Sequence, residues 1–302
     1  MNNSIPETMK KILFSLVFFI TGSGIVFAQD SIPAETKKTL EKAPFESSYF
    51  IDDQTVALPP AKTLQLVLQH RFGTIQNDFS DLFGIWGASN IRFGLDYTIT
   101  KNLLVGIGET KNKTMTDFQV KYTFIRQQKG GFPFTMALYG VMGIDGRNKS
   151  AFGTEFKSVH RLSYYSELMI ARRFCKMFSA QVGLAWVHYN LVDSSDARSK
   201  RDDHVNSWYN SNIQLSGIGR LKVSPQTSII ATYSQSLLTY TNTMPWPNAG
   251  LGVEISTSTH AFQIFLAAAN GIVPQEVAFY NNNNPYNGAI LIGFNMTRLW
   301  TF

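Results

Sequence analysis

The C-terminal stretch of this chain constrains its fold more than any other part of the sequence. Residues 289–302 read AILIGFNMTRLWTF, with apolar or aromatic side chains at the even positions except Arg298. The odd positions are mostly small or polar. A period of two indicates a β-strand with two different faces. The run exceeds the roughly 9–11 residues that a tilted strand needs to cross a bilayer. It therefore predicts a terminal membrane-spanning strand, although a soluble sandwich can also end in this way.

The same alternation recurs from Lys62 onward and predicts about 12 strands, the last being the C-terminal stretch. The others are expected at 63–72, 90–98, 102–110, 117–127, 134–143, 160–173, 178–189, 212–223, 227–237, 248–257 and 260–270. Tight turns largely alternate with long connections rich in Asn, Asp, Ser and Gly. This alternation is typical of single-chain bacterial barrels. Because hydrocarbon offers no hydrogen-bond partners, only a closed sheet satisfies every strand edge. We therefore expect an all-β fold, a closed antiparallel transmembrane β-barrel with short periplasmic turns and long extracellular loops.

The N-terminus predicts export. Met9-Lys10-Lys11 is followed by an apolar run at 12–20 and by Ala28, the pattern of a signal peptide removed after residue 28. Residues 29–61 are polar and predict a periplasmic lead segment that forms a small hairpin or a plug at the pore mouth. Residues 62–302 would form the barrel, so the expected location is the bacterial outer membrane.

Composition narrows the class further. Charged residues make up 16% of the chain, against roughly 25% in soluble domains. The formal net charge of +6 is too small an excess to indicate nucleic-acid binding. A single cysteine, Cys175, excludes an intrachain disulfide.

No enzyme motif is found in the sequence. The five histidines, His70, His160, His188, His204 and His260, lack metal-ligand spacing. His-x-Ser, Gly-x-Ser-x-Gly and phosphate-binding loops are absent as well. The sequence therefore predicts no catalytic residue, no metal and no cofactor, and an outer-membrane lipid hydrolase is the least favoured function.

Charged side chains recur on the predicted inward face. They are Arg71, Arg92, Asp96, Lys121, Arg161, Glu167, Arg173, Arg220, Lys222 and Glu254. Basic rings concentrate anions, so this set favours a narrow porin-like channel for small solutes with an anion preference. The alternative is a structural network that fills the lumen of a non-conducting barrel, which then serves as a membrane anchor or docking scaffold.

Aromatic side chains lie near the predicted strand ends, where a membrane girdle belongs. The candidates are Phe72, Tyr97, Trp186, Trp300 and Phe302. The expected partners are outer-membrane lipid and, through the C-terminal strand, the barrel-assembly machinery, and the barrel is expected to be a monomer.

Several stretches resemble an uncharacterised family of Gram-negative outer-membrane β-barrels. Near the start these are 66–73, 81–84, 91–97 and 105–108. Further matches are Tyr122, 168–174, 187–191, 260–264 and 294–298. The resemblance runs from about Lys62 to Phe302 and implies a membrane-embedded barrel. The family is a domain of unknown function, so it implies neither a substrate nor catalytic residues.

Overall fold

The computed structural model describes residues 39–192, 210–238 and 245–302. The predicted signal peptide, the first part of the predicted lead segment and His204 lie outside these ranges.

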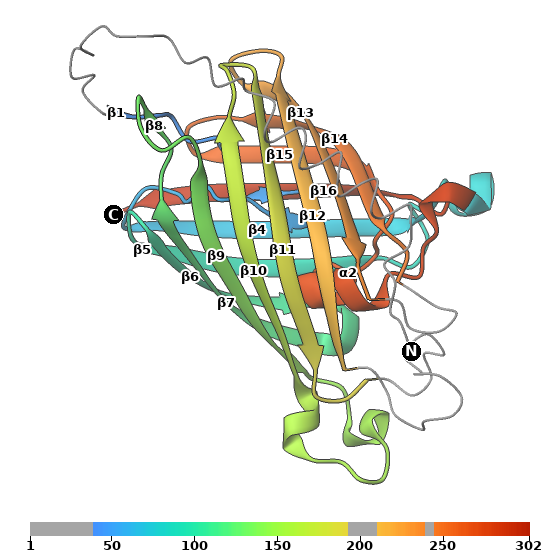
Figure 1. The fold of residues 1–302 in the computed structure, drawn as a ribbon. Coiled ribbons are helices and arrows are strands. Elements are labelled where there is room, and N and C mark those ends of the chain that lie inside the picture. Colours follow the sequence, from blue (N-terminus) through green and yellow to red (C-terminus); the bar gives the residue numbers. More distant parts are fainter. Residues whose placement is uncertain (1–38, 193–209, 239–244) are drawn as a thin grey trace, which may run out of the picture. The chain divides into compact units, whose positions relative to one another are not determined.

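Twelve antiparallel strands close into one barrel (Figure 1). They are β4 (Thr63–Thr74), β5 (Asn90–Thr100), β6 (Leu103–Thr110), β7 (Met115–Ile125), β9 (Thr135–Asp145), β10 (Leu162–Arg173), β11 (Phe178–Tyr189), β12 (Ser211–Lys222), β13 (Thr227–Ser236), β14 (Asn248–Ser256), β15 (His260–Ala267) and β16 (Leu291–Thr301). Each strand pairs with the next one along the chain, and β16 pairs with β4 to complete the circle. The predicted fold class is therefore confirmed.

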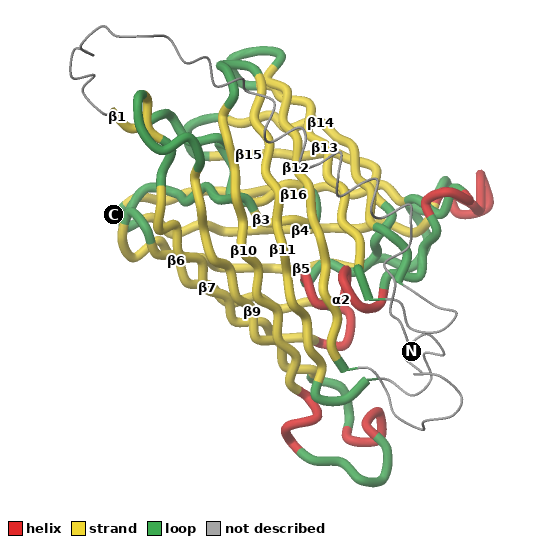
Figure 2. The backbone as a smooth tube through the Cα atoms, viewed as in Figure 1, coloured by secondary structure: helices red, strands yellow, loops and turns green. Residues whose placement is uncertain are grey.

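The barrel has two unlike rims (Figure 2). The short-turn rim, where β4 begins and β16 ends, carries compact connections such as residues 174–177 and 223–226. The long-loop rim carries the extended connections 75–89, 146–161 and 268–290. One connection at that rim, residues 111–114 between β6 and β7, is short. At the short-turn rim, residues 126–134 form a longer connection, so the predicted sorting of turns and loops holds apart from these two connections.

Short helices and short strands lie at the rims and in the interior of the barrel. The connections contain 3-10 helices η1 (Ile75–Asp81), η2 (Asn112–Thr114), η3 (Lys149–Phe152), η4 (Ser158–Arg161) and η6 (Pro285–Asn287). An α-helix, α2 (Pro274–Tyr280), follows β15. Two small ladders pair β1 (Thr39–Leu40) with β8 (Gln128–Lys129) and β2 (Tyr49–Phe50) with β3 (Asp53–Gln54). In the described ranges, no helix has both the length and the apolar character to span a membrane.

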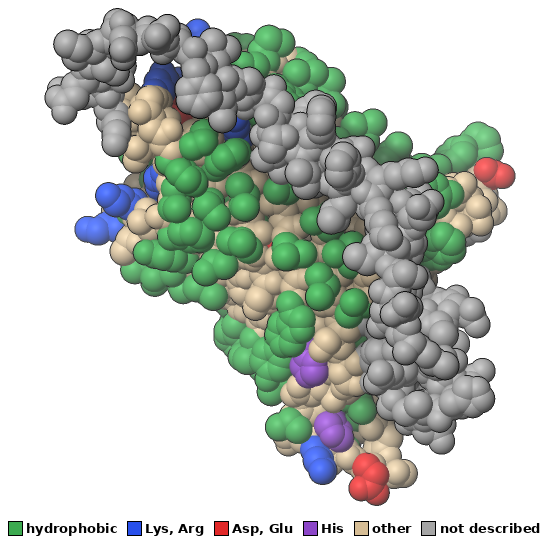
Figure 3. Space-filling view, in the orientation of Figure 1, with side chains coloured by type: hydrophobic (Ala, Val, Ile, Leu, Met, Phe, Trp, Pro, Cys, Tyr) green, Lys and Arg blue, Asp and Glu red, His purple; other side chains and the backbone are tan. Residues whose placement is uncertain are grey.

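Apolar side chains cover the outside of the barrel. Ile264 is 69% exposed, Phe93 55% and Leu184 52%, whereas their strand neighbours point into the barrel and are buried. Figure 3 shows hydrophobic side chains gathered over the strands of the visible face. A soluble domain would bury such residues, because each fully buried side chain of this kind is worth about 1.5–3 kcal/mol. The outer face is therefore the lipid-facing one.

Placing a charge on this face should destabilise the barrel. Ile264 lies within β15 and pairs with Val253 and Phe294 of the neighbouring strands. Arginine there must be taken into hydrocarbon, so Ile264→Arg is expected to cost about 2–4 kcal/mol of unfolding free energy. Urea unfolding of the protein folded into lipid vesicles measures this cost. In the control Val159→Arg, the substituted side chain is 53% exposed in a loop, and the expected change is below about 0.5 kcal/mol. Equal stabilities would contradict the lipid-facing assignment.

Candidate functional site: the filled lumen

The barrel interior is occupied by residues 45–58, here called the lumen segment. From Phe45 to Ala57 every side chain except that of Glu46 is buried. The residues that flank it are fixed at the short-turn rim, where Glu41 N–H donates to Gln127 O and Lys62 N–H donates to Thr98 O. Between these points it folds into the β2–β3 hairpin, whose tip is Ile51 and Asp52. The lumen segment thus enters and leaves the barrel through the same rim.

Wall glutamines satisfy the peptide groups of the lumen segment. Gln181 accepts from Val56 N–H at 2.9 Å and donates to Gln54 O at 2.7 Å. Gln263 does the same with Ile51 N–H at 3.1 Å and Tyr49 O at 2.6 Å. Each side-chain amide therefore replaces one peptide of a neighbouring strand. Buried peptide groups need such partners, so these two glutamines allow a short hairpin to stay inside the barrel.

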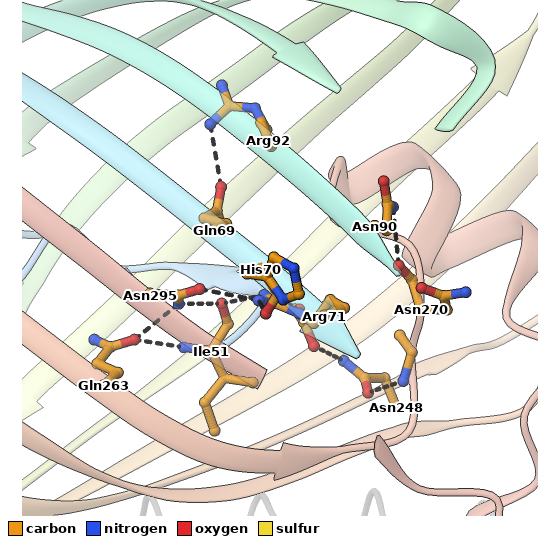
Figure 4. A network of polar contacts seen from close by, with 12 residues as sticks. Ile51, Gln69, His70, Arg71, Asn90, Arg92, Asn248, Gln263, Asn270 and Asn295 are labelled. Atoms are coloured by element: carbon orange, nitrogen blue, oxygen red, sulfur yellow. Dashed lines mark hydrogen bonds and ion pairs between the residues drawn. The ribbon is translucent and has the colours of Figure 1, made fainter. Parts of the chain in front are cut away.

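The tip of the lumen segment is held by a buried ion pair. Arg71 Nη2 lies 2.5 Å from Asp52 Oδ1, and both side chains are fully buried. Asn248 donates to the other Asp52 oxygen at 2.8 Å. Arg71 and Asn295 both donate to Ile51 O, at 3.0 and 2.7 Å. Figure 4 shows Arg71 beside Asn295, Ile51 and Asn248. An ion pair and three hydrogen bonds thus hold this one turn, which anchors the tip of the lumen segment to the wall.

Tyr49 connects the lumen segment to a second polar cluster. Its hydroxyl donates to Asp96 at 2.9 Å and accepts from Gln119 at 2.7 Å. Tyr139 donates to the other end of the Gln119 amide at 2.7 Å. Burial raises the pKa of Tyr49, with Asp96 as the next cause. Burial also raises the pKa of Asp53, and the carboxylates of Glu167 and Asp52 raise it further.

A further ion pair lies within the wall itself. Arg92 donates through Nε at 2.8 Å and through Nη2 at 2.6 Å to the two carboxylate oxygens of Asp117. Its third nitrogen donates to Gln69 at 3.1 Å. A Cβ added at Gly108 would lie 2.2 Å from Arg92 Nη2, so glycine at that position makes room for the guanidinium. This pair joins β5 to β7 across β6, and the hydrogen bonds of Arg92 go to wall residues.

Three further charged groups of the lumen have hydrogen-bond partners. Lys121 donates to Gln54 Oε1 at 2.9 Å and to Thr55 O at 3.1 Å, both in the lumen segment. Glu167 accepts from Ser216 at 2.7 Å, and Glu254 accepts from Gln263 at 2.7 Å.

Most of the predicted lumen residues lie inside the barrel. Those buried and inward-facing are Arg71, Arg92, Asp96, Lys121, Glu167, Arg220 and Glu254. Arg173 and Lys222 are half-buried where β10 and β12 end at the short-turn rim. There Glu46 pairs with Lys222 and lies 3.9 Å from Arg220.

The prediction for Arg161 was wrong. This residue belongs to η4, because β10 begins only at Leu162. Its guanidinium lies 4.8 Å from the ring centroid of Phe152 and donates to the carbonyls of Asp145 and Arg147. Arg161 therefore braces the loop between β9 and β10 and does not line the lumen.

The predicted girdle aromatics are found near the rims. Phe72 and Trp186 lie near the long-loop ends of β4 and β11, and Tyr97 near the short-turn end of β5. Trp300, half-buried, and Phe302, 79% exposed, end the chain at the short-turn rim, and the guanidinium of Arg298 lies 4.9 Å from the Trp300 ring centroid.

The lumen is covered at the long-loop rim by α2. Val277, Ala278 and Phe279 of this helix are buried and pack toward the ends of β10 to β13. Ser236 Oγ donates to Ala278 O at 2.6 Å, and the rings of Phe279 and Tyr189 lie 5.2 Å apart. Both the lumen segment and α2 therefore restrict the passage.

Sequence reasoning missed the partners that the lumen segment supplies, above all Asp52 and Tyr49. A usable signal was the row of glutamines at inward positions, including Gln65, Gln119, Gln181 and Gln263. Side-chain amides in a lumen suit peptide groups as well as water.

A histidine and a serine, a combination used in nucleophilic catalysis, lie in contact outside the lumen. His188 Nδ1 and Ser211 Oγ are 2.8 Å apart on β11 and β12, and the imidazole stacks on Trp186 at 5.5 Å. The residues are 23 positions apart, so no short motif could indicate the contact. Among the residues that the structure describes, no group of three or more His, Cys, Asp or Glu side chains could hold a metal ion.

The family to which the sequence is matched has the same architecture. The family described as "Membrane bound beta barrel domain (DUF5777)" matches residues 45–300. No curated protein matches the sequence. Among solved structures, the NanC porin is 8% identical, with 79% of this chain and 99% of that chain covered and a TM-score of 0.47. The COG4313 outer membrane channel from Pseudomonas putida F1 is 12% identical over 81% and 97%, with a TM-score of 0.46. Outer membrane phospholipase A from Escherichia coli is 13% identical over 79% and 90%, with a TM-score of 0.40.

Proposed function

Since the chain belongs to the family of membrane-bound β-barrel domains DUF5777, we propose that it is an outer-membrane, porin-like channel closed by its own lumen segment. The channel would conduct small polar solutes and would have no enzymatic activity. The observation that carries this proposal is the polar wall beneath the lumen segment. Gln65, Gln181, Gln263 and Asn295 all face the interior and are buried. A wall of this kind can hydrate when the lumen segment withdraws.

The way in which the lumen segment is held supports reversible closure. The contacts described above between the lumen segment and the wall are hydrogen bonds and ion pairs. Water can replace such hydrogen bonds, which are each worth about 0.5–1.5 kcal/mol net. Both ends of the lumen segment lie at one rim, so it can withdraw without passing through the barrel.

The charge balance favours anions once the lumen segment has left. Of the predicted residues that line the lumen or its short-turn rim, together with Asp117, six are basic and four are acidic. The basic ones are Arg71, Arg92, Lys121, Arg173, Arg220 and Lys222. The lumen segment adds three acids, Glu46, Asp52 and Asp53. Counted as formal charges, the balance thus changes from −1 to +2 on opening, and excess positive charge raises the local concentration of anions.

A non-conducting barrel that serves as an anchor or docking scaffold is the second candidate. It is favoured by the complete burial of Phe50, Ile51 and Thr55 in the lumen and by the α2 cover at the other rim. In this alternative the lumen segment is a permanent part of the core.

Recordings in planar lipid bilayers separate the two candidates. The full chain should be closed most of the time and show brief conductance steps, whose reversal potential in a KCl gradient indicates anion preference. Lys121→Met should reduce that preference, because it removes a lumen charge. Arg161→Met, outside the lumen, should leave it unchanged. Steps that prefer cations, or that respond equally to both variants, would contradict the anion channel. A barrel that never conducts, even when the contacts between the lumen segment and the wall are weakened, would support the non-conducting anchor or scaffold.

A further inference from the structure

A large polar pocket opens at the long-loop rim, beside α2 and away from the lumen segment. Its volume is about 770 Å³, within the range of roughly 300–1,000 Å³ found for small-molecule sites. The connections after β4, β6 and β15 form it together with the end of α2. Six asparagines line it: Asn90, Asn112, Asn270, Asn281, Asn282 and Asn283.

Hydrogen bonds hold several of these asparagines in place. Asn90 donates to Asn270 O at 3.0 Å, as Figure 4 shows, and its carbonyl oxygen accepts from Asn112 N–H at 3.1 Å. Asn283 donates to Ala268 O at 2.7 Å. Each side-chain amide has two donor hydrogens and an acceptor oxygen. A fixed array of such groups suits a ligand with several hydroxyls, because each hydroxyl also donates and accepts.

A buried acceptor in the pocket wall lacks a donor. Glu276 is 1% exposed, and Asn112 donates to its Oε1 at 2.7 Å. Its second oxygen, Oε2, has no hydrogen-bond partner. A buried acceptor without a donor is unfavourable, and a ligand hydroxyl would satisfy it. Burial raises the pKa of Glu276 to about 7; Asp145 also raises it, whereas Lys113, Arg147 and the backbone N–H of Ile272 lower it.

Positive charge and an aromatic ring complete the pocket. Lys111 is exposed, and its Nζ donates to Ser89 O at 3.0 Å. The Nζ of Lys113 lies 3.7 Å from the ring centroid of Tyr280. The lining thus carries two ammonium groups against the one carboxyl of Glu276. An anionic group on the ligand would be attracted to the side of the pocket that carries the lysines.

We propose that this pocket binds an acidic sugar of the uronic-acid type. The ring hydroxyls would bond to the asparagine amides and to Glu276, the sugar face would lie near Tyr280, and the carboxylate would lie near Lys111. Simple inorganic anions would use only the lysines and leave most of the pocket empty. The site lies outside the lumen segment, so its occupancy can be measured whether or not the barrel conducts.

Calorimetric titration of the detergent-solubilised full chain tests the proposal, with D-glucuronate, D-glucose and acetate as probes. D-Glucuronate should bind on the order of tenfold more tightly than either of the others, because only it offers both hydroxyls and a carboxylate. Lys111→Met should weaken D-glucuronate binding about fivefold and leave D-glucose binding unchanged. Asn282→Ala should weaken both sugars.

Lys157→Met is the matched control, because Lys157 is an exposed lysine of another long loop and does not line the pocket. It should bind like the wild-type chain. Equal binding of D-glucose and D-glucuronate, loss of binding in the Lys157→Met control, or no binding of either sugar would each overturn the proposal. Conductance plays no part in these measurements, so their failure would leave the proposed channel function untouched.

Discussion

Replacing Asp52 with alanine should turn a mostly closed barrel into one that conducts steadily. The substitution leaves the Arg71 guanidinium buried without its carboxylate, and breaking a buried pair in this way costs about 3–5 kcal/mol. That cost falls on the state in which the lumen segment is docked, because Asp52 belongs to the lumen segment and Arg71 to the wall. The ratio of open to closed barrels should therefore rise at least about 100-fold, as measured by the open probability in planar bilayers.

Two further variants make this result specific. Asp53→Asn changes the neighbouring acid, whose Oδ2 has no hydrogen-bond partner, and should leave the open probability close to that of the wild-type chain. The double variant Asp52→Ala/Arg71→Met removes both charges and should restore most of the closure, because an apolar replacement of a whole buried pair is often nearly neutral. An Asp52→Ala barrel that stays closed, while it still migrates as a folded barrel in unheated SDS, would contradict the gating role of the lumen segment.

Arg92→Met should weaken the barrel itself without opening it. Arg92 and Asp117 both belong to the wall, with side chains only 4% and 2% exposed. Removal of the guanidinium leaves Asp117 as an unpaired buried charge, so the expected loss of unfolding free energy is about 3–5 kcal/mol. Urea unfolding in lipid vesicles measures the loss, and bilayer recordings should show an open probability like that of the wild-type chain.

The paired substitution provides the control for the wall pair. Arg92→Met/Asp117→Leu should recover most of the lost stability, whereas Arg161→Met, in a half-exposed loop site, should change it by less than about 1 kcal/mol. If Arg92→Met opened the barrel as strongly as Asp52→Ala, the distinction between wall contacts and lumen-segment contacts would be wrong.

The strands could be predicted from the sequence because lipid and lumen impose opposite demands on alternate residues. The predicted strand at 178–189 coincides with β11, where Leu184 and Trp186 face out while Gln181 and Val187 face in. Hydrocarbon accepts no polar group without a partner, so the alternation is strict and local. The signal weakened in β9, whose inward Ala137, Tyr139 and Val141 are also apolar.

The contents of the lumen could not be predicted in the same way. The conformation of the lumen segment depends on partners far along the chain, such as Gln263, which is 212 residues from Ile51. No local period encodes that contact. The helix α2 was missed because its seven residues are too few for a helical repeat to stand out. Arg161 was misplaced because the strand predicted at 160–173 begins only at Leu162. Such a boundary depends on how the neighbouring loop packs.

The seam between the first and last barrel strands bears on biogenesis. Arg71 of β4 and Asn295 of β16 grip the same turn from opposite sides of that seam. The N-terminal β2–β3 hairpin is synthesised first, yet its binding site is incomplete until β16 pairs with β4. Closure of the barrel and docking of the hairpin are consequently one cooperative event. Any lateral separation of β4 and β16 would also weaken the binding of the hairpin inside the barrel.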